Sequence, residues 1–276
     1  MTSGTHQHLT LLKKSTKAIS TTDGKSIDVF ELQLASASEA ALKAWAKHFR
    51  TQYCLDDELD NLRDGSGKSR KEFLLESIFP SATTNLGPAV RSGDFVEILI
   101  SDVLENQYGY WVPRTRHSGK MVRDESPRGS DILGFKLSSN AEGVWSSNDI
   151  LLVCEAKGQL SGKLPKARLQ DAVDDSVKDA LRKSESLIAA KRRLLQLNRL
   201  VDARRVARFQ DPLARPHIEH AGAAATFCSS VFDEALIQAT DCSQHPNHQS
   251  IKLVVLHAST LMKFVHSLYE RAADEA

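Results

Sequence analysis

The stretch LLVCEAKGQL, residues 151–160, decides how the sequence is interpreted. Its first four residues are apolar and predict a strand that is buried on both faces. Glu155 and Lys157 follow in the same run, although an unpaired buried charge is costly. Side chains two apart on a strand share a face, so these two point the same way. The pair marks either the solvated end of the strand, as an ordinary ion pair, or a site that is kept for chemistry.

A second predicted strand, DILGFKL (131–137), begins with Asp131 after the turn PRGS. If this strand lies next to the first, Asp131 comes close to Glu155. Two carboxylates in a cleft repel unless a cation joins them, and hard oxygen ligands suit Mg²⁺ or Mn²⁺. Such a metal lowers the pKa of a bound water and stabilises charge on a phosphate, while Lys157 beside it orients or deprotonates that water.

A predicted helix, SGDFVEILISDVLENQ (92–107), supplies a third acid. Ser92 is its expected N-cap. Five apolar residues recur at helical spacing and form one stripe: Val96, Leu99, Ile100, Val103 and Leu104. Glu97 lies at the edge of this stripe, so we expect it to face the sheet. The alternative is that the Glu97 carboxylate extends toward solvent and pairs with an arginine.

The rest of the chain alternates strand and helix patterns, which predicts an α/β fold with a mixed sheet flanked by helices. We expect an N-terminal α/β region over residues 1–85, packed on a larger domain over residues 86–276. Strands are expected at 27–34 and 251–257, helices at 35–53, 167–209 (one or two) and 259–276, a β-prone segment at 108–114 and a polar surface loop at 56–72.

Composition narrows the classes of function. The 276 residues are 41% hydrophobic with a net charge of +1, and no segment is apolar enough to span a bilayer, so we expect a soluble, cytoplasmic protein. The four cysteines form no C-x-x-C pair, which argues against a zinc site. DGSGKS (64–69) lacks the first glycine of a phosphate-binding loop, because position 62 is Leu62. Any ATPase is therefore expected on a separate chain.

Basic residues concentrate in one predicted helical segment. Residues 163–215 contain 14 Lys or Arg against 7 Asp or Glu. The functional interpretation is a surface that follows DNA phosphates, with five candidate residues: Lys191, Arg192, Arg193, Arg204 and Arg205. The alternative is a solvated helix face or a surface for an acidic partner. The loop 114–128 is also basic and adjoins the proposed site, either to steer the scissile strand or as a surface hairpin.

The order Glu97, Asp131 and Glu155-Ala156-Lys157 resembles the PD-(D/E)xK nuclease superfamily over roughly residues 90–180. Ser130 stands where the motif's name expects proline. The resemblance implies a restriction-endonuclease-like core and Mg²⁺-dependent hydrolysis of phosphodiesters. In that scheme Asp131 and Glu155 bind the metal, Lys157 activates water, and Glu97 supports the metal or the lysine.

A narrower resemblance extends further along the chain. GDFVEILI, GSDILGF, CEAKG and the terminal LVVLHASTLMKFVHSLYERA are similar to the HamA family, the nuclease subunits of the two-gene Hachiman antiphage defence system. This implies a DNA-cleaving effector that a separate HamB-like helicase holds in check. The alternative is a catalytically silent subunit that keeps the nuclease fold and binds nucleic acid or a partner protein.

Overall fold

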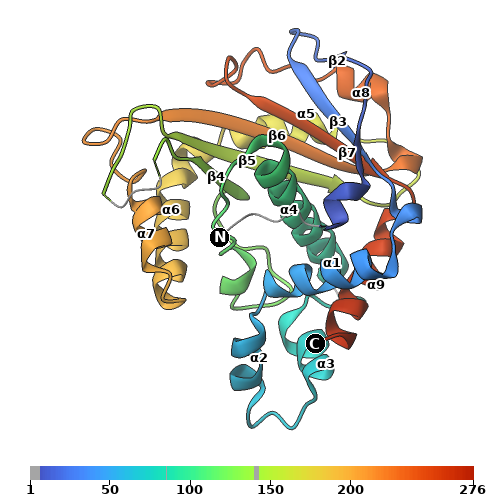
Figure 1. The fold of residues 1–276 in the computed structure, drawn as a ribbon. Helices are drawn as coiled ribbons and strands as arrows, with labels where there is room; N and C mark the ends of the chain where they lie inside the picture. The colour runs from blue at the N-terminus through green and yellow to red at the C-terminus, as the bar shows by residue number, and fades with distance from the viewer. Residues whose placement is uncertain (1–6, 85, 140–142) are drawn as a thin grey trace.

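The computed structural model describes residues 7–84, 86–139 and 143–276 and has a mixed sheet at its centre (Figure 1). The seven strands follow the order β1-β3-β7-β6-β5-β4, with β2 paired to β3. The inner strands β3, β7, β6 and β5 are parallel, and β1 and β4 run antiparallel at the edges. The strands span Leu12–Lys14 (β1), Ile19–Ser20 (β2), Ser26–Leu32 (β3), Ile132–Lys136 (β4), Ile150–Gln159 (β5), Ile218–Cys228 (β6) and Lys252–Ala258 (β7).

Helices cover both faces of this sheet (Figure 1). The long helix α4 crosses one face together with α1 and α9, and α5 lies on the other face with the α6–α7 pair beside β4 and β5. The helices span Glu39–Thr51 (α1), Asp56–Arg63 (α2), Arg70–Phe73 (α3), Gly87–Tyr108 (α4), Arg168–Ser176 (α5), Asp179–Gln196 (α6), Leu200–Ala207 (α7), Glu234–Gln238 (α8) and Leu261–Asp274 (α9). The predicted α/β class, a helix-flanked mixed sheet, is confirmed.

Strand β5, which contains the apolar run 151–154, is buried on both faces, as predicted. Leu151 packs toward α6 and α7, whereas Leu152 packs toward α4, and both are fully buried. This two-sided burial explains the continuous apolar run before Glu155. The same strand carries its charged residues into the region where α4, β4 and α6 meet.

The sequence prediction missed β6, although it is a central strand. Its alanine-rich stretch has low β propensity, so composition argued against a strand. Close packing between neighbouring strands requires these small residues. At Gly222, an added Cβ would lie 2.9 Å from the side chain of Cys154 on β5, and Ala224 is fully buried.

Four further expectations were wrong in detail. Residues 56–72 form α2 and α3, because Leu59 is buried and Ser69 and Glu72 make a capping box. Helix α4 begins at Gly87 with Pro88 in its first turn, so Ser92 lies inside the helix. The segment 108–114 makes one isolated bridge, and 167–209 is three helices rather than one or two, with Asn198 in a left-handed conformation between α6 and α7.

The N-terminal region adds strands to the same sheet, because β3 pairs with β7. The boundary at residue 85 stays a prediction. Within the described residues, no helix is long and apolar enough to cross a membrane.

Candidate functional site

The antiparallel pairing of β4 and β5 places two carboxylates at adjacent strand positions. Ile132 pairs with Cys154, so the next position along the register sets Asp131 opposite Glu155. Oδ2 of Asp131 also accepts a hydrogen bond from the backbone N–H of Ala156 at 3.1 Å. Glu155 is therefore held within β5. Asp131 directly precedes β4 and is held by its hydrogen bond to the backbone of β5.

Lys157 lies on the same strand and is held by two acids. Its Nζ is 2.7 Å from Oε1 of Glu155 and 2.7 Å from Oδ2 of Asp175. Asp175 lies near the end of α5 and was not predicted, although acids recur there in the sequence DAVDDSVKD. The two carboxylates raise the pKa of Lys157 against the effect of its burial, so the side chain stays an ammonium.

Glu97 faces the sheet from α4, as expected, and is 6% exposed. It meets an arginine that the sequence analysis had not singled out. Arg116 donates from Nε to Oε2 of Glu97 at 2.6 Å and from Nη2 to Oδ1 of Asp131 at 2.8 Å. One guanidinium therefore joins the helix acid to the strand acid. The signal for it was the basic run RTRHSGK (114–120), which follows a helix with acids at helical spacing.

A further acid lies behind these residues. Asp179, the first residue of α6, is 4% exposed. Burial raises its pKa to about 6, and the negative charge of Glu155 contributes to the increase. The site therefore includes two acids from the α5–α6 region, Asp175 and Asp179, beyond the four residues that the motif predicted.

Burial controls the protonation of the predicted site. It raises the pKa of Glu97 and of Glu155 to about 7, and that of Asp131 to about 6. Repulsion adds to the increase: the charge of Glu97 raises the pKa of Asp131, and the charge of Asp131 raises the pKa of Glu155. Buried carboxylates of this kind are stabilised as anions by a nearby cation.

The chemistry of the donor set suits a hard divalent cation, although the oxygens of Glu97, Asp131 and Glu155 do not all lie within 4.8 Å of one another in this arrangement. Glu97, Asp131 and Glu155 offer only carboxylate oxygens, which are the ligands that Mg²⁺ and Mn²⁺ prefer. Oε2 of Glu155 is buried and has no hydrogen-bond partner among the described residues, so it is available to such an ion. The other two acids have an oxygen each engaged by Arg116.

Two cavities adjoin the acids and share part of their lining. One has a volume of about 740 Å³ and reaches Glu155 and Lys157. The other has a volume of about 520 Å³ and extends along α6 to Arg192 and Arg193. The residues common to both are Glu97, Arg116, Pro127, Arg128 and Asp131. The acids thus lie where the two cavities meet.

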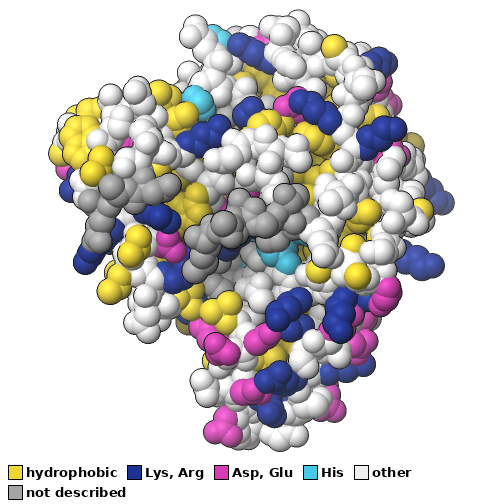
Figure 2. All heavy atoms as spheres, viewed as in Figure 1, with side chains coloured by type: hydrophobic (Ala, Val, Ile, Leu, Met, Phe, Trp, Pro, Cys, Tyr) yellow, Lys and Arg dark blue, Asp and Glu magenta, His cyan; other side chains and the backbone are white. Residues whose placement is uncertain are grey.

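The five predicted phosphate-binding residues have different surroundings. Lys191 donates to Gln210, and Arg193 donates to Ser118 and lies 3.3 Å from Glu58. On α7, Arg205 pairs with Asp202 while Arg204 is exposed, and on α6 Arg192 is exposed at the rim of the smaller cavity. On the face drawn in Figure 2, basic and acidic side chains are intermixed, most densely over α2 and α3.

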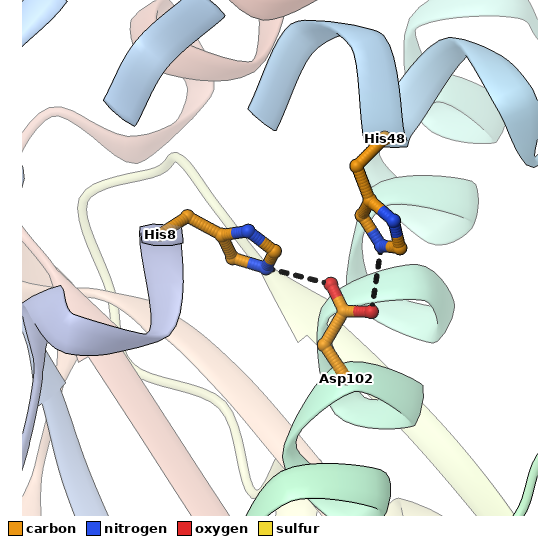
Figure 3. A group of neighbouring side chains, drawn as sticks. All are labelled: His8, His48 and Asp102. Atoms are coloured by element: carbon orange, nitrogen blue, oxygen red, sulfur yellow. Dashed lines mark hydrogen bonds and ion pairs between the residues drawn. The ribbon is translucent and has the colours of Figure 1, made fainter. Parts of the chain in front are cut away.

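A separate buried cluster brings two histidines onto one carboxylate (Figure 3). The Nε2 atoms of His8 and His48 each lie 2.8 Å from an oxygen of Asp102. It is the one group of three potential metal ligands that comes within 4.8 Å in the described part of the chain. Arg114 also pairs with Asp102, which supplies a positive charge to this carboxylate. The cluster ties the N-terminal segment and α1 to α4.

The seven-stranded mixed sheet flanked by helices makes this an α/β protein whose architecture is consistent with a nuclease-like core. The family model described as HamA matches residues 7–272, so the chain belongs to the HamA family. HamA proteins are components of the Hachiman antiphage defence system. Searches of curated proteins and of solved structures gave no match to the chain.

Proposed function

We propose that this chain is a metal-dependent DNA nuclease, the effector subunit of a Hachiman system that works with a separate helicase. The observation that carries the proposal is the pairing of Asp131 with Glu155 at adjacent strand positions, with Lys157 two residues on. These side chains line a cavity of about 740 Å³ that is open to a substrate strand. A surface meant only for binding gains little from acids that face phosphates.

Each residue has a role that follows from its surroundings. Asp131 and Glu155 would hold Mg²⁺ or Mn²⁺, with Glu97 in support. When bound, the ion supplies positive charge against the phosphate and acidifies water. Lys157, kept protonated by Glu155 and Asp175, positions the attacking water and offsets charge on the phosphate. The water oxygen would then bond to phosphorus in line as the opposite P–O bond breaks, with the proton lost by the water passing to solvent and the departing oxygen taking a proton from solvent.

Cations on the cavity walls support a phosphodiester substrate. Arg128 lines both cavities and makes no hydrogen bond or ion pair within the described residues. Arg192 lines the smaller cavity on the α6 side. A strand that passes from one cavity to the other would cross the acids beside Arg128 and then run toward Arg192. DNA as the substrate rests on the defence-system family rather than on any base-reading feature.

A catalytically silent subunit remains the second candidate. The observation that favours it is Arg116, which already forms direct ion pairs with both Glu97 and Asp131. A fold that needed its acids only for stability would have this arrangement.

The test is incubation of the purified chain with labelled plasmid and Mg²⁺, with and without its helicase partner. We expect cleavage that requires the metal and that Asp131→Asn abolishes. Asp174→Asn is the matched control, because Asp174 is exposed and contacts Gln170 rather than the site. No cleavage in any combination would favour the silent subunit, whereas equal cleavage by Asp131→Asn would remove Asp131 from the proposed site.

A further inference from the structure

A short basic segment lies across an acidic row on α4. We call residues 114–120 the basic strap. Its cationic side chains reach carboxylates on successive turns of the helix, and His117 lies 3.6 Å from oxygens of both Asp94 and Glu97. The remaining pairs are Arg114 with Asp102 and Glu105, Arg116 with Glu97, and Lys120 with Asp94.

Arg116 is the member of the basic strap that reaches the proposed metal ligands. It uses all three nitrogens of its guanidinium: Nε toward Glu97, Nη2 toward Asp131, and Nη1 toward the backbone oxygen of Ser130 at 2.7 Å. Its side chain is 16% exposed, so these interactions are little screened by solvent. A planar fork with several donors suits this bridging, which a lysine would not reproduce.

A divalent cation and this guanidinium compete for the same acids. Oε2 of Glu97 and Oδ1 of Asp131 already accept hydrogen bonds from Arg116. A bound divalent ion and the guanidinium would also repel each other, because both would sit on the same two carboxylates.

We propose that Arg116 is a built-in competitor of the catalytic metal, so that the basic strap keeps the site inhibited until the guanidinium leaves the two acids. This inference rests on the proposed nuclease function. The strap continues into a solvent-facing stretch in which Met121 is 98% exposed and Val122 is 51% exposed. Beyond these two residues the segment is anchored again, because Arg123 donates to the backbone oxygen of Leu75 and Asp124 accepts from the backbone N–H of Ser81. Because the two equilibria are linked, any partner or ligand that releases Arg116 from Glu97 and Asp131 strengthens metal binding, and bound metal weakens these two ion pairs.

The test measures metal binding rather than cleavage. Titration calorimetry with Mn²⁺, without DNA and at mildly alkaline pH, compares the parent with Arg116→Gln. We expect the variant to bind Mn²⁺ more tightly by about tenfold or more, a usual size for such coupling. Arg271→Gln is the matched control, because Arg271 pairs with Glu39 and Glu275 and lines neither of these cavities. Its Mn²⁺ affinity should equal that of the parent.

The outcomes separate this inference from the proposed function. Equal or weaker Mn²⁺ binding by Arg116→Gln, with binding by the parent intact, overturns the competition and leaves the nuclease proposal standing. No Mn²⁺ binding by either protein overturns both. Should Arg116→Gln not fold, the parent itself provides the test through the NMR signal of the Arg116 Nε–H, assigned by its absence in Arg116→Lys. Mg²⁺ should shift or broaden that signal, and an unchanged signal at saturating Mg²⁺ contradicts the competition.

Discussion

Nζ of Lys157 lies 2.7 Å from Oε1 of Glu155, while Oε2 of the same carboxylate is buried without a hydrogen-bond partner among the described residues. One oxygen of the acid therefore holds the lysine, and the other is left for a further cation. An ordinary rim ion pair would be solvated on both oxygens. The relationship makes Glu155 the link between the lysine and the proposed metal.

The first prediction concerns Lys157→Ala. A lysine that only paired with Glu155 would contribute under about 1 kcal/mol, so its loss would spare activity. A lysine that positions the attacking water should matter roughly a hundredfold or more in rate. We expect the alanine variant to fold, to bind DNA nearly as well as the parent, and to fail to cut. Initial cleavage rate, melting temperature and DNA affinity together check this.

Arginine at position 157 is the companion variant. Its guanidinium keeps the charge but has a different shape, so we expect poor rescue of cleavage. Cleavage near the parental rate by the folded alanine variant would instead return Glu155 and Lys157 to an ordinary ion pair.

The second prediction assigns Asp175 the positioning of Lys157. Asp175→Asn removes one of the two acids that raise the pKa of Lys157. We expect cleavage to fall several-fold and the alkaline limb of its pH–rate profile to move to lower pH, because the ammonium deprotonates more readily. Asp171→Asn, one turn earlier on α5 and paired with Arg168, is the control. A lower rate with an unmoved profile would mean that Asp175 acts only through the fold.

The third prediction follows from the pKa of Glu97, which burial raises to about 7 from its ordinary 4.5. The folded state binds this proton more tightly than the unfolded state, so the associated stability is present below about pH 4.5 and is lost as the pH rises toward 7. In metal-free protein, Glu97→Gln should therefore gain stability relative to the parent over this range, by roughly 1 to 3 kcal/mol. Denaturant unfolding at a series of pH values measures the difference, and parallel curves for the two proteins would refute it.

The fourth prediction concerns the basic residues of α6 and α7. If they contact phosphates, each contact that is lost should lower the slope of log affinity against log salt by roughly one unit. Arg192→Ala should show this most clearly, since Arg192 is exposed on the cavity side, whereas Lys191 and Arg193 make contacts within the protein. The comparison is DNA affinity over a range of salt for single variants and for alanine at all five positions. Unchanged slopes would make this surface a partner contact or a solvated face.

The strands of the site were predictable because their signal is local. The apolar run before Glu155 and the position of Asp131 after a turn indicated two adjacent strands, and β4 and β5 are paired. Arg116 and Asp175 were not predictable in the same way, since their contacts depend on how a loop and a helix end fold back in space. The alanine-rich β6 was missed because tight packing against Cys154, rather than β propensity, selects its residues.

The most direct measurement is the position of Mn²⁺ by anomalous scattering from crystals of the parent and of Arg116→Gln grown with the ion. The account predicts a peak between Asp131 and Glu155, with higher occupancy in the variant. A peak at His8, His48 and Asp102, with none between Asp131 and Glu155 in either crystal, would contradict it.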